Sequence, residues 1–242
     1  MARPPRPLTQ LISAGLRVFT EKGYRRTQMA DVAREMGVSP GTLYTYVHGK
    51  EALFHLLIDR ALLDDPGAPA PELPVPTPPP GATLARLRER LTADAQLPGL
   101  QAALSRRRAV DPRAELEAVV RELYALIEKG RLGIMLIERS ALDLPELMHL
   151  FYGEVRRGLL ERLQRYLAAR IRAGQMEPVP DAAAAAKLIE ETVAWFAMHR
   201  HRDPDPTVVD DHTARETVVH FVVSTLTPRR RPRARPHKED RR

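Results

Sequence analysis

The stretch that most constrains the fold is residues 27–58, which carry the pattern of two short helices joined by a tight turn, with a third helix behind them. The first helix is predicted to begin near Thr27, because apolar residues then recur at intervals of three and four positions. Gly37 can adopt the left-handed conformation of an exit turn. Ser39 is placed as an N-cap whose hydroxyl accepts from the N–H three residues later, and Pro40 fits the first helical position. The sequence therefore predicts a helix-turn-helix.

The second helix of this stretch, predicted from Pro40 to about Val47, has an outward side suited to close contact with another molecule. Small residues at its start let a backbone approach, and the hydroxyls and phenols that follow can form hydrogen bonds. A recognition helix in a major groove needs these properties. Thr27, as N-cap, and Lys50, at the next helix start, are candidate phosphate ligands. The predicted DNA-binding residues are Arg26, Thr27, Ser39, Pro40, Gly41, Thr42, Tyr44, Thr45, Tyr46 and Lys50.

Helical spacing alone fits a small bundle without a ligand equally well, but the order of residues is more specific. The run MADVAREMGVSPGTLYTYVHGKEALF closely resembles the signature of the TetR/AcrR family of bacterial transcriptional regulators. Val47 departs from that signature, because the family usually carries an aromatic residue there. The resemblance covers roughly residues 8–62. It implies an all-α fold, with an N-terminal three-helix DNA-binding head and a larger C-terminal helical body for ligand binding and dimerisation.

The net charge of +7 is unevenly distributed along the chain. Residues 1–50 hold eight Lys or Arg against three Asp or Glu, and residues 228–242 hold eight against two. The intervening residues 51–227 hold 22 against 26. A basic end that contains a helix-turn-helix is the electrostatic pattern expected of a DNA-binding module. The slightly acidic middle argues against polyanion binding there.

Several other classes of protein are not favoured by the sequence. No apolar run reaches the roughly 18 residues of a membrane-spanning helix, so no membrane association is expected. The absence of cysteine excludes disulfides and fits a cytoplasmic protein, and no signal peptide is evident. No Walker loop, dinucleotide fingerprint or nucleophile elbow is present, so neither an enzyme nor a cofactor is predicted. His199 and His201 do not have the spacing of a helical metal site, and no metal is expected.

The chain is predicted to divide into four parts. Residues 1–65 form the DNA-binding domain, 66–81 a proline-rich linker or insertion with eight prolines, 82–227 the effector-binding and dimerisation domain, and 228–242 a disordered basic tail. The arm at residues 2–7 either contacts DNA or is frayed. The predicted helices outside the helix-turn-helix are Thr9–Glu21, Lys50–Leu63, Ala82–Leu97, Gly99–Val110, Pro112–Lys129, Gly130–Ala141, Pro145–Ala173, Asp181–His199 and Thr207–Leu226.

The last two of these helices are apolar around most of their circumference, which favours a partner surface over a buried core hairpin. The resemblance likewise implies dimerisation here through a four-helix bundle, and a two-fold dimer would read a palindromic operator in double-stranded DNA. The predicted homodimer interface consists of Leu188, Ile189, Val193, Trp195, Phe196, Val218, Val219, Phe221, Val222 and Leu226.

The remaining helices are expected, from the resemblance, to enclose a cavity for a small apolar or amphipathic effector. The candidate lining residues are Leu104, Leu123, Tyr124, Ile127, Met135, Ile137, Phe151 and Tyr152. The predicted function is a dimeric one-component regulator, a repressor released by its effector. The alternatives are a non-specific architectural DNA-binding protein and a helical adaptor without an effector.

Overall fold

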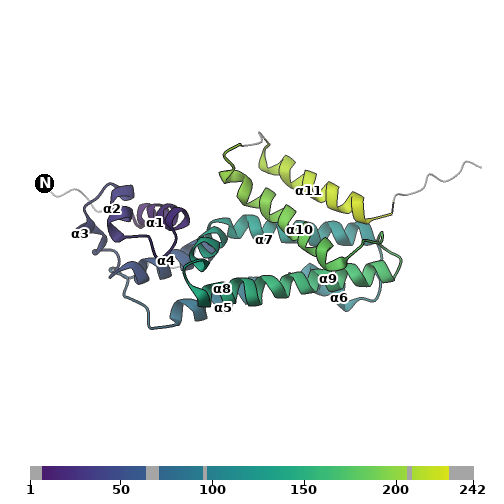
Figure 1. The fold of residues 1–242 in the computed structure, drawn as a ribbon, viewed down its shortest axis with the longest axis horizontal. Coiled ribbons are helices and arrows are strands. Elements are labelled where there is room, and N and C mark those ends of the chain that lie inside the picture. The colour runs from purple at the N-terminus through teal and green to yellow at the C-terminus, as the bar shows by residue number, and fades with distance from the viewer. Residues whose placement is uncertain (1–6, 64–70, 95–96, 206–208, 229–242) are drawn as a thin grey trace, which may run out of the picture.

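The computed structural model describes residues 7–63, 71–94, 97–205 and 209–228, and in these residues the chain is an elongated all-α protein, as predicted (Figure 1). A small helical head lies at one end and a longer helical body extends from it. The predicted arm at residues 2–7, except Pro7, and the predicted tail beyond residue 228 lie outside the described residues. The head contains α1 (Leu8–Lys22), α2 (Met29–Met36), α3 (Pro40–Leu43) and α4 (Lys50–Leu63).

The entry into the helix-turn-helix differs from the prediction. Gln28, and not Thr27, is the N-cap of α2, and the Asp31 carboxylate accepts a hydrogen bond of 3.1 Å from the Gln28 N–H. This reciprocal arrangement is a capping box, which satisfies N–H groups that the first turn leaves free. The predicted exit turn is confirmed, because Gly37 ends α2 in the left-handed conformation, with φ 66°.

The recognition helix is shorter than predicted. α3 ends at Leu43, and the chain then turns so that the N–H groups of Tyr46 and Val47 both bond to the Leu43 carbonyl, at 2.9 and 3.1 Å. Ser39 is extended as an N-cap should be, but its hydroxyl pairs with the Thr42 hydroxyl at 2.9 Å. The predicted bond from the Thr42 N–H to the Ser39 hydroxyl is therefore wrong; that N–H bonds to the Ser39 carbonyl at 3.0 Å.

The described part of the proline-rich segment is attached to the head. Val75 donates its N–H to the Tyr46 carbonyl at 2.8 Å, and the Val75 carbonyl accepts from the His48 N–H at 3.0 Å. Its side chain is buried in the core of the head. The prolines on either side of Val75 have no N–H group to donate such bonds. Residues 71–81 therefore brace the turn that follows α3.

The body is built around one long helix, α7 (Pro112–Ala141). The predicted break at Gly130 is wrong: a glycine inside a helix costs only about 1 kcal/mol relative to alanine, and the helix continues through it to Ala141. Asp111 caps its start by accepting from the N–H groups of Arg113 and Ala114. The other body elements are α5 (Ala82–Asp94), α6 (Pro98–Ser105), α8 (Pro145–Met148), η1 (His149–Arg156), α9 (Arg157–Arg172), α10 (Ala182–Ala197), η2 (His199–Arg202) and α11 (Asp211–Leu226).

Several predicted ends in the body are confirmed, and others are corrected. The run from Pro145 to residue 172 is helical as predicted, but its part η1 is a π-helix. Asp181 caps α10 by accepting from the Ala184 N–H at 2.6 Å, and the β-branched segment of α11 is a helix, as expected. Leu97, the predicted last residue of the helix from Ala82, is instead the N-cap of α6, and α6 ends earlier than predicted, at Ser105.

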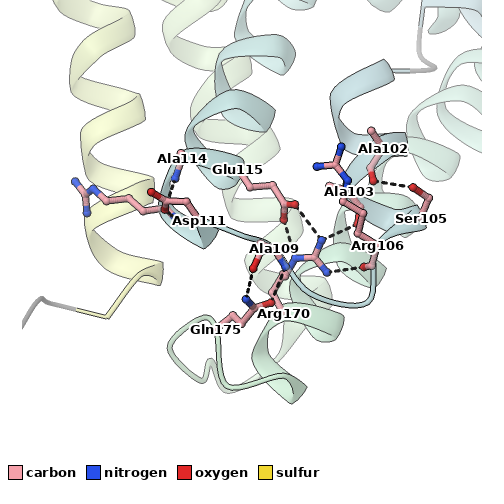
Figure 2. Close-up of polar contacts among 11 residues, drawn as sticks. Ala102, Ala103, Ser105, Arg106, Ala109, Asp111, Ala114, Glu115, Arg170 and Gln175 are labelled. Atoms are coloured by element: carbon pink, nitrogen blue, oxygen red, sulfur yellow. Dashed lines mark hydrogen bonds and ion pairs between the residues drawn. The ribbon is translucent and has the colours of Figure 1, made fainter.

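α6 stops early because the loop after it is held from α9 (Figure 2). Arg170 is 1% exposed and donates to the Glu115 carboxylate at 2.7 and 3.1 Å. The same guanidinium donates to the carbonyls of Ala103 at 2.6 Å and of Arg106 at 3.1 Å. Gln175 adds two bonds to the backbone of Ala109. These bonds satisfy backbone groups that a continued helix would have used.

The buried apolar residues form two clusters. The first contains the head core together with residues of α5, the C-terminal part of α7, α8 and η1. The second fills the far part of the body between α6, α7, α9, α10 and α11. The predicted boundary between head and body stays a prediction, because the first cluster crosses it.

Candidate DNA-binding surface and effector cavity

The surface around the start of α3 is small, polar and open. Ser39, Pro40 and Gly41 are exposed, and a methyl group added at Gly41 would meet no atom closer than 3.9 Å. Tyr44 projects beyond them with 51% of its surface exposed, beside the exposed Thr45. Thr42 is half-buried. A backbone that can be approached closely, flanked by hydroxyl and phenol groups, is what contact with base edges and phosphates requires.

Two predicted DNA-binding side chains are not on this surface. Thr27 is 1% exposed and its hydroxyl donates to the Gly23 carbonyl at 2.6 Å. Tyr46 is 3% exposed, because the turn after α3 directs its ring into the head core under the proline-rich segment. The prediction that these two side chains face outward is therefore wrong. Val47 is fully buried.

Cationic groups flank the surface. Arg26 is exposed and uses its Nε to donate to the Lys22 carbonyl at 3.0 Å. Lys50 donates to the Tyr24 carbonyl at 3.2 Å and lies 4.7 Å from the centre of the Tyr24 ring. Both cationic groups have further donors for a phosphate. Asp31 is paired within the head, and its hydrogen bond from Lys22 lowers the pKa of that carboxyl.

The head is joined to the body at the end of α1. Arg139 of α7 donates to the carbonyls of Glu21 and Lys22 at 3.2 and 3.3 Å. Asp143, just past the end of α7, accepts from the Arg25 N–H at 2.9 Å. Gly23 lies between these contacts with φ 83°, and a methyl group there would come within 2.5 Å of the Asp143 carboxylate. The residues leading into the helix-turn-helix are thus held by the C-terminal end of α7.

The outer face of α10 and α11 carries two large exposed apolar side chains, Leu188 at 65% and Phe221 at 61% exposed. Trp195 and Phe196 are half-buried, with their rings 4.8 Å apart. The other predicted interface residues pack within the core of a single chain, where a partner cannot reach them. For these six the interface prediction is wrong: Ile189, Val193, Val218, Val219, Val222 and Leu226.

A cavity of about 130 Å³ lies between α5, α7, η1, α9 and α10. Among the predicted lining residues, Ile127 and Phe151 line it. The remaining six do not line this cavity, so their assignment to it is wrong. Four of these side chains are buried in the core, and two are half-buried elsewhere in the body. These six are Leu104, Leu123, Tyr124, Met135, Ile137 and Tyr152.

The cavity also has a charged wall that the sequence analysis missed. Glu138, Arg156 and Glu190 come from three different elements and lie along it. The Arg156 guanidinium donates to both oxygens of Glu190, at 2.9 and 2.8 Å. Burial raises the pKa of the Glu138 carboxyl above its ordinary value. The sequence does hold one signal for Glu138. Glu138 follows Ile134, another lining residue, by four positions, and so lies on the same face of α7.

The described residues contain no cluster of three or more His, Asp or Glu side chains that would suit a metal ion. No helix in the described ranges has both the length and the apolar character needed to cross a membrane.

Comparison with known proteins supports the assignment of the head. Residues 11–57 match the family described as "Bacterial regulatory proteins, tetR family". A 42-residue stretch is 40% identical to the fatty acid metabolism regulator protein of Bacillus subtilis, covering 17% of this chain and 22% of that protein. The first curated relatives are thus matched over less than a third of their length. The transcriptional repressor KstR2 of Rhodococcus jostii is 23% identical over 203 residues, which cover 84% of this chain and 83% of that protein.

The whole fold also has solved counterparts. SCO3833, a member of the TetR transcriptional regulator family from Streptomyces coelicolor, aligns with a TM-score of 0.56 and 20% identity, over 94% of each chain. At that identity the likeness shows the fold alone. The fold of the described residues and the family match of the helix-turn-helix are consistent with each other. The helix-turn-helix head, residues 11–57, belongs to the tetR family of bacterial regulatory proteins.

Proposed function

We propose that this protein is a one-component transcriptional repressor that binds a palindromic operator as a homodimer and is released by a small molecule bound in its body. The observation that carries the proposal is the exposed, small-residue start of α3 with Tyr44 beside it, on a basic head. The name of the relative KstR2, a repressor, supports repression over activation.

In the proposed complex, α3 enters the major groove and Tyr44 contacts a base edge or the adjacent phosphate, while Arg26 and Lys50 hold the backbone. Base-edge contacts provide specificity, and phosphate contacts provide affinity that depends on salt. Since α3 has only four helical residues, one head can contact few base pairs. A two-fold dimer that places a second head along the duplex supplies the missing contacts.

The exposed pair Leu188 and Phe221 supports a dimer through α10 and α11. Two large apolar side chains on adjacent helices form a patch that water solvates poorly, and contact with the same patch of a second chain would bury it. The six buried residues beneath them keep that face rigid. The interface we propose therefore uses the outer face of these helices, with Trp195 and Phe196 at its margin.

The position of the cavity supports the proposed release of the protein from its operator. Its wall includes Ile127, Ile134 and Glu138 of α7, the helix whose end holds the head through Arg139 and Asp143. A ligand that enlarges the cavity would displace α7 and α4, which packs on it, and so change the distance between the two heads. A coupling of about 1–3 kcal/mol would be enough for a typical allosteric response.

The test is selection of bound duplexes from a random DNA pool at about 150 mM salt, which suppresses purely electrostatic binding. We expect a palindrome with two half-sites. Tyr44→Ala should weaken binding to that sequence about tenfold or more, as loss of a specific contact does. Arg26→Ala should weaken binding to all sequences and reduce the salt dependence, whereas Arg172→Ala, an exposed arginine of α9, should do neither.

The same experiment separates the alternatives. Equal binding to random DNA would indicate an architectural protein, and no binding at this salt concentration would indicate an adaptor. The dimer is tested independently by sedimentation of Leu188→Glu and Phe221→Glu, which should be monomeric. Leu142→Glu, a 66% exposed leucine outside α10 and α11, is the matched control and should leave the dimer intact. A dimer that survives both interface substitutions would contradict the proposed face.

A further inference from the structure

Five charged groups lie on or beside one wall of the cavity: the carboxylates of Glu138, Glu190 and Glu191, and the cations Arg156 and Lys187. Arg156 is bound to Glu190 and also to Glu191, the latter at 2.9 Å. Lys187 pairs with the same two carboxylates, at 3.6 and 2.7 Å. Arg156 and Lys187 therefore pair with Glu190 and Glu191, and the charges of these four groups cancel. Glu138 is the fifth group and has no share in this network of ion pairs.

Glu138 lies on the wall with little compensation. Its closest ion-pair contact among the described residues is with His199, a long contact of 3.8 Å between Nε2 and Oε2. Burial raises the pKa of the Glu138 carboxyl, and the nearby charges of Glu190 and Glu191 raise it further, against the opposing effects of His199 and Arg156. A carboxylate that is partly desolvated and poorly paired is costly unless a cation or donor reaches it.

The rest of the cavity is apolar and small. Leu91, Ile127, Phe151, Leu159, Ala194 and Met198 form its buried walls. Its volume of about 130 Å³ is close to that of an engineered apolar cavity of roughly 150 Å³ that holds one benzene molecule. This volume corresponds to a group of about the size of one ring.

Two further cations, Arg90 and Lys129, also line the cavity. Lys129 is exposed, so its ammonium is solvated and contributes little to a ligand held inside. An anionic ligand drawn to these residues would have to keep its charge near them and away from Glu138. Beside Glu138, a positive group is therefore favoured over a negative one.

We propose that the cavity binds a compact hydrophobic ammonium or amidinium compound, with its cationic group against Glu138 and its apolar part between α7, η1 and α10. This assignment rests on the proposed effector role of the cavity, but binding itself can be measured without DNA. The ligand would supply the positive charge that Arg156 and Lys187 supply to the neighbouring carboxylates. Its apolar part would fill the space beside Ile127 and Phe151.

The experiment compares three probes that share one ring: benzylamine, benzyl alcohol and benzoate. Binding to the full chain is measured by calorimetry or by ligand-observed NMR at pH 7. We expect benzylamine to bind about tenfold more tightly than benzyl alcohol, the difference of ~1.4 kcal/mol that one charged hydrogen bond provides, and benzoate to bind least. Glu138→Gln should remove the preference for the amine while leaving binding of the alcohol unchanged.

Glu161→Gln, which alters an exposed carboxylate of α9, is the matched control and should keep the preference. Circular dichroism establishes that each variant is folded, and Glu138→Asp, which retains the charge, should retain part of the preference. Tighter binding of benzoate, binding of no probe, or an unchanged preference in Glu138→Gln would overturn the proposal. A protein that binds benzylamine but selects no DNA sequence would refute the regulatory function and leave the cavity assignment intact.

Discussion

The buried arginine of α9 provides the sharpest test of how the body is held together. Arg170 links α9 to two other segments: it donates to the Glu115 carboxylate on α7, and to the carbonyls of Ala103 and Arg106 at the end of α6. Its guanidinium also lies 5.3 Å from the centre of the Tyr166 ring. Substitution Arg170→Met keeps the apolar stem and removes every one of these polar bonds.

The expected cost follows from what remains behind. The Glu115 side chain is only 12% exposed, so its charge would be left nearly buried without a partner. Removal of one partner of a buried ion pair typically costs about 3–5 kcal/mol. The total stability of a folded protein is about 5–15 kcal/mol. We therefore expect Arg170→Met to lower the free energy of unfolding by about 4 kcal/mol, and the melting temperature by roughly 10 °C.

The assay is urea unfolding followed by circular dichroism at one fixed protein concentration, since the proposed dimer would contribute to stability. Arg172→Met, an exposed arginine two residues along the same helix, should change stability by less than about 0.5 kcal/mol. The double variant Arg170→Met with Glu115→Leu should recover at least about 1 kcal/mol, because it removes the unpaired charge as well. A cost below about 1 kcal/mol for Arg170→Met, or strictly additive effects in the double variant, would refute this account.

Three further predictions concern the head junction, the cavity and a helix cap, and all can be measured by the same unfolding assay. Gly23→Ala should cost about 1–3 kcal/mol, because it strains a positive φ and displaces the Asp143 carboxylate, while Gly49→Ala, with no atom closer than 3.6 Å, should be nearly neutral. Burial raises the pKa of Glu138 above its ordinary 4.5, so the folded protein binds the proton more tightly than the unfolded chain, and the stability contribution of this group falls as pH rises above that value. Glu138→Gln should accordingly be more stable than the parent at pH 7, and the two should converge as the pH falls below about 4.5; an advantage that grows on acidification would contradict the sign. Asp181→Ala should cost about 1 kcal/mol by removing the N-cap of α10.

The helix-turn-helix could be predicted from the sequence because its signals are local. The glycine turn at residue 37, the proline at the start of α3 and the spacing of apolar residues in α2 act within a few positions of one another. The length of α3 could not be predicted in this way. The turn after Leu43 is braced by Val75, which lies far along the chain within a proline-rich segment whose pairing no local pattern indicates.

The cavity and the dimer face were only partly predictable for the same physical reason. A search for apolar residues finds core positions such as Leu123 and Ile137, but the charged wall arises because Arg156 and Glu190, 34 positions apart, meet in the folded chain. In α10, apolar residues occur all around the helix because α10 packs against α7, α9 and α11. Only the burial of each side chain separates Leu188, which faces solvent, from Val193, which does not.

The continuity of α7 through Gly130 has a mechanical consequence. A helix of 30 residues is about 45 Å long, so a tilt of about 5° around its far end would move the near end by roughly 4 Å. That near end carries Arg139 and is followed by Asp143, which hold α1 and the entry to α2. A broken helix would absorb such a tilt at the break. A continuous α7 would instead transmit the proposed rearrangement of side chains around the cavity to the head, as a displacement comparable to the rise of one base pair.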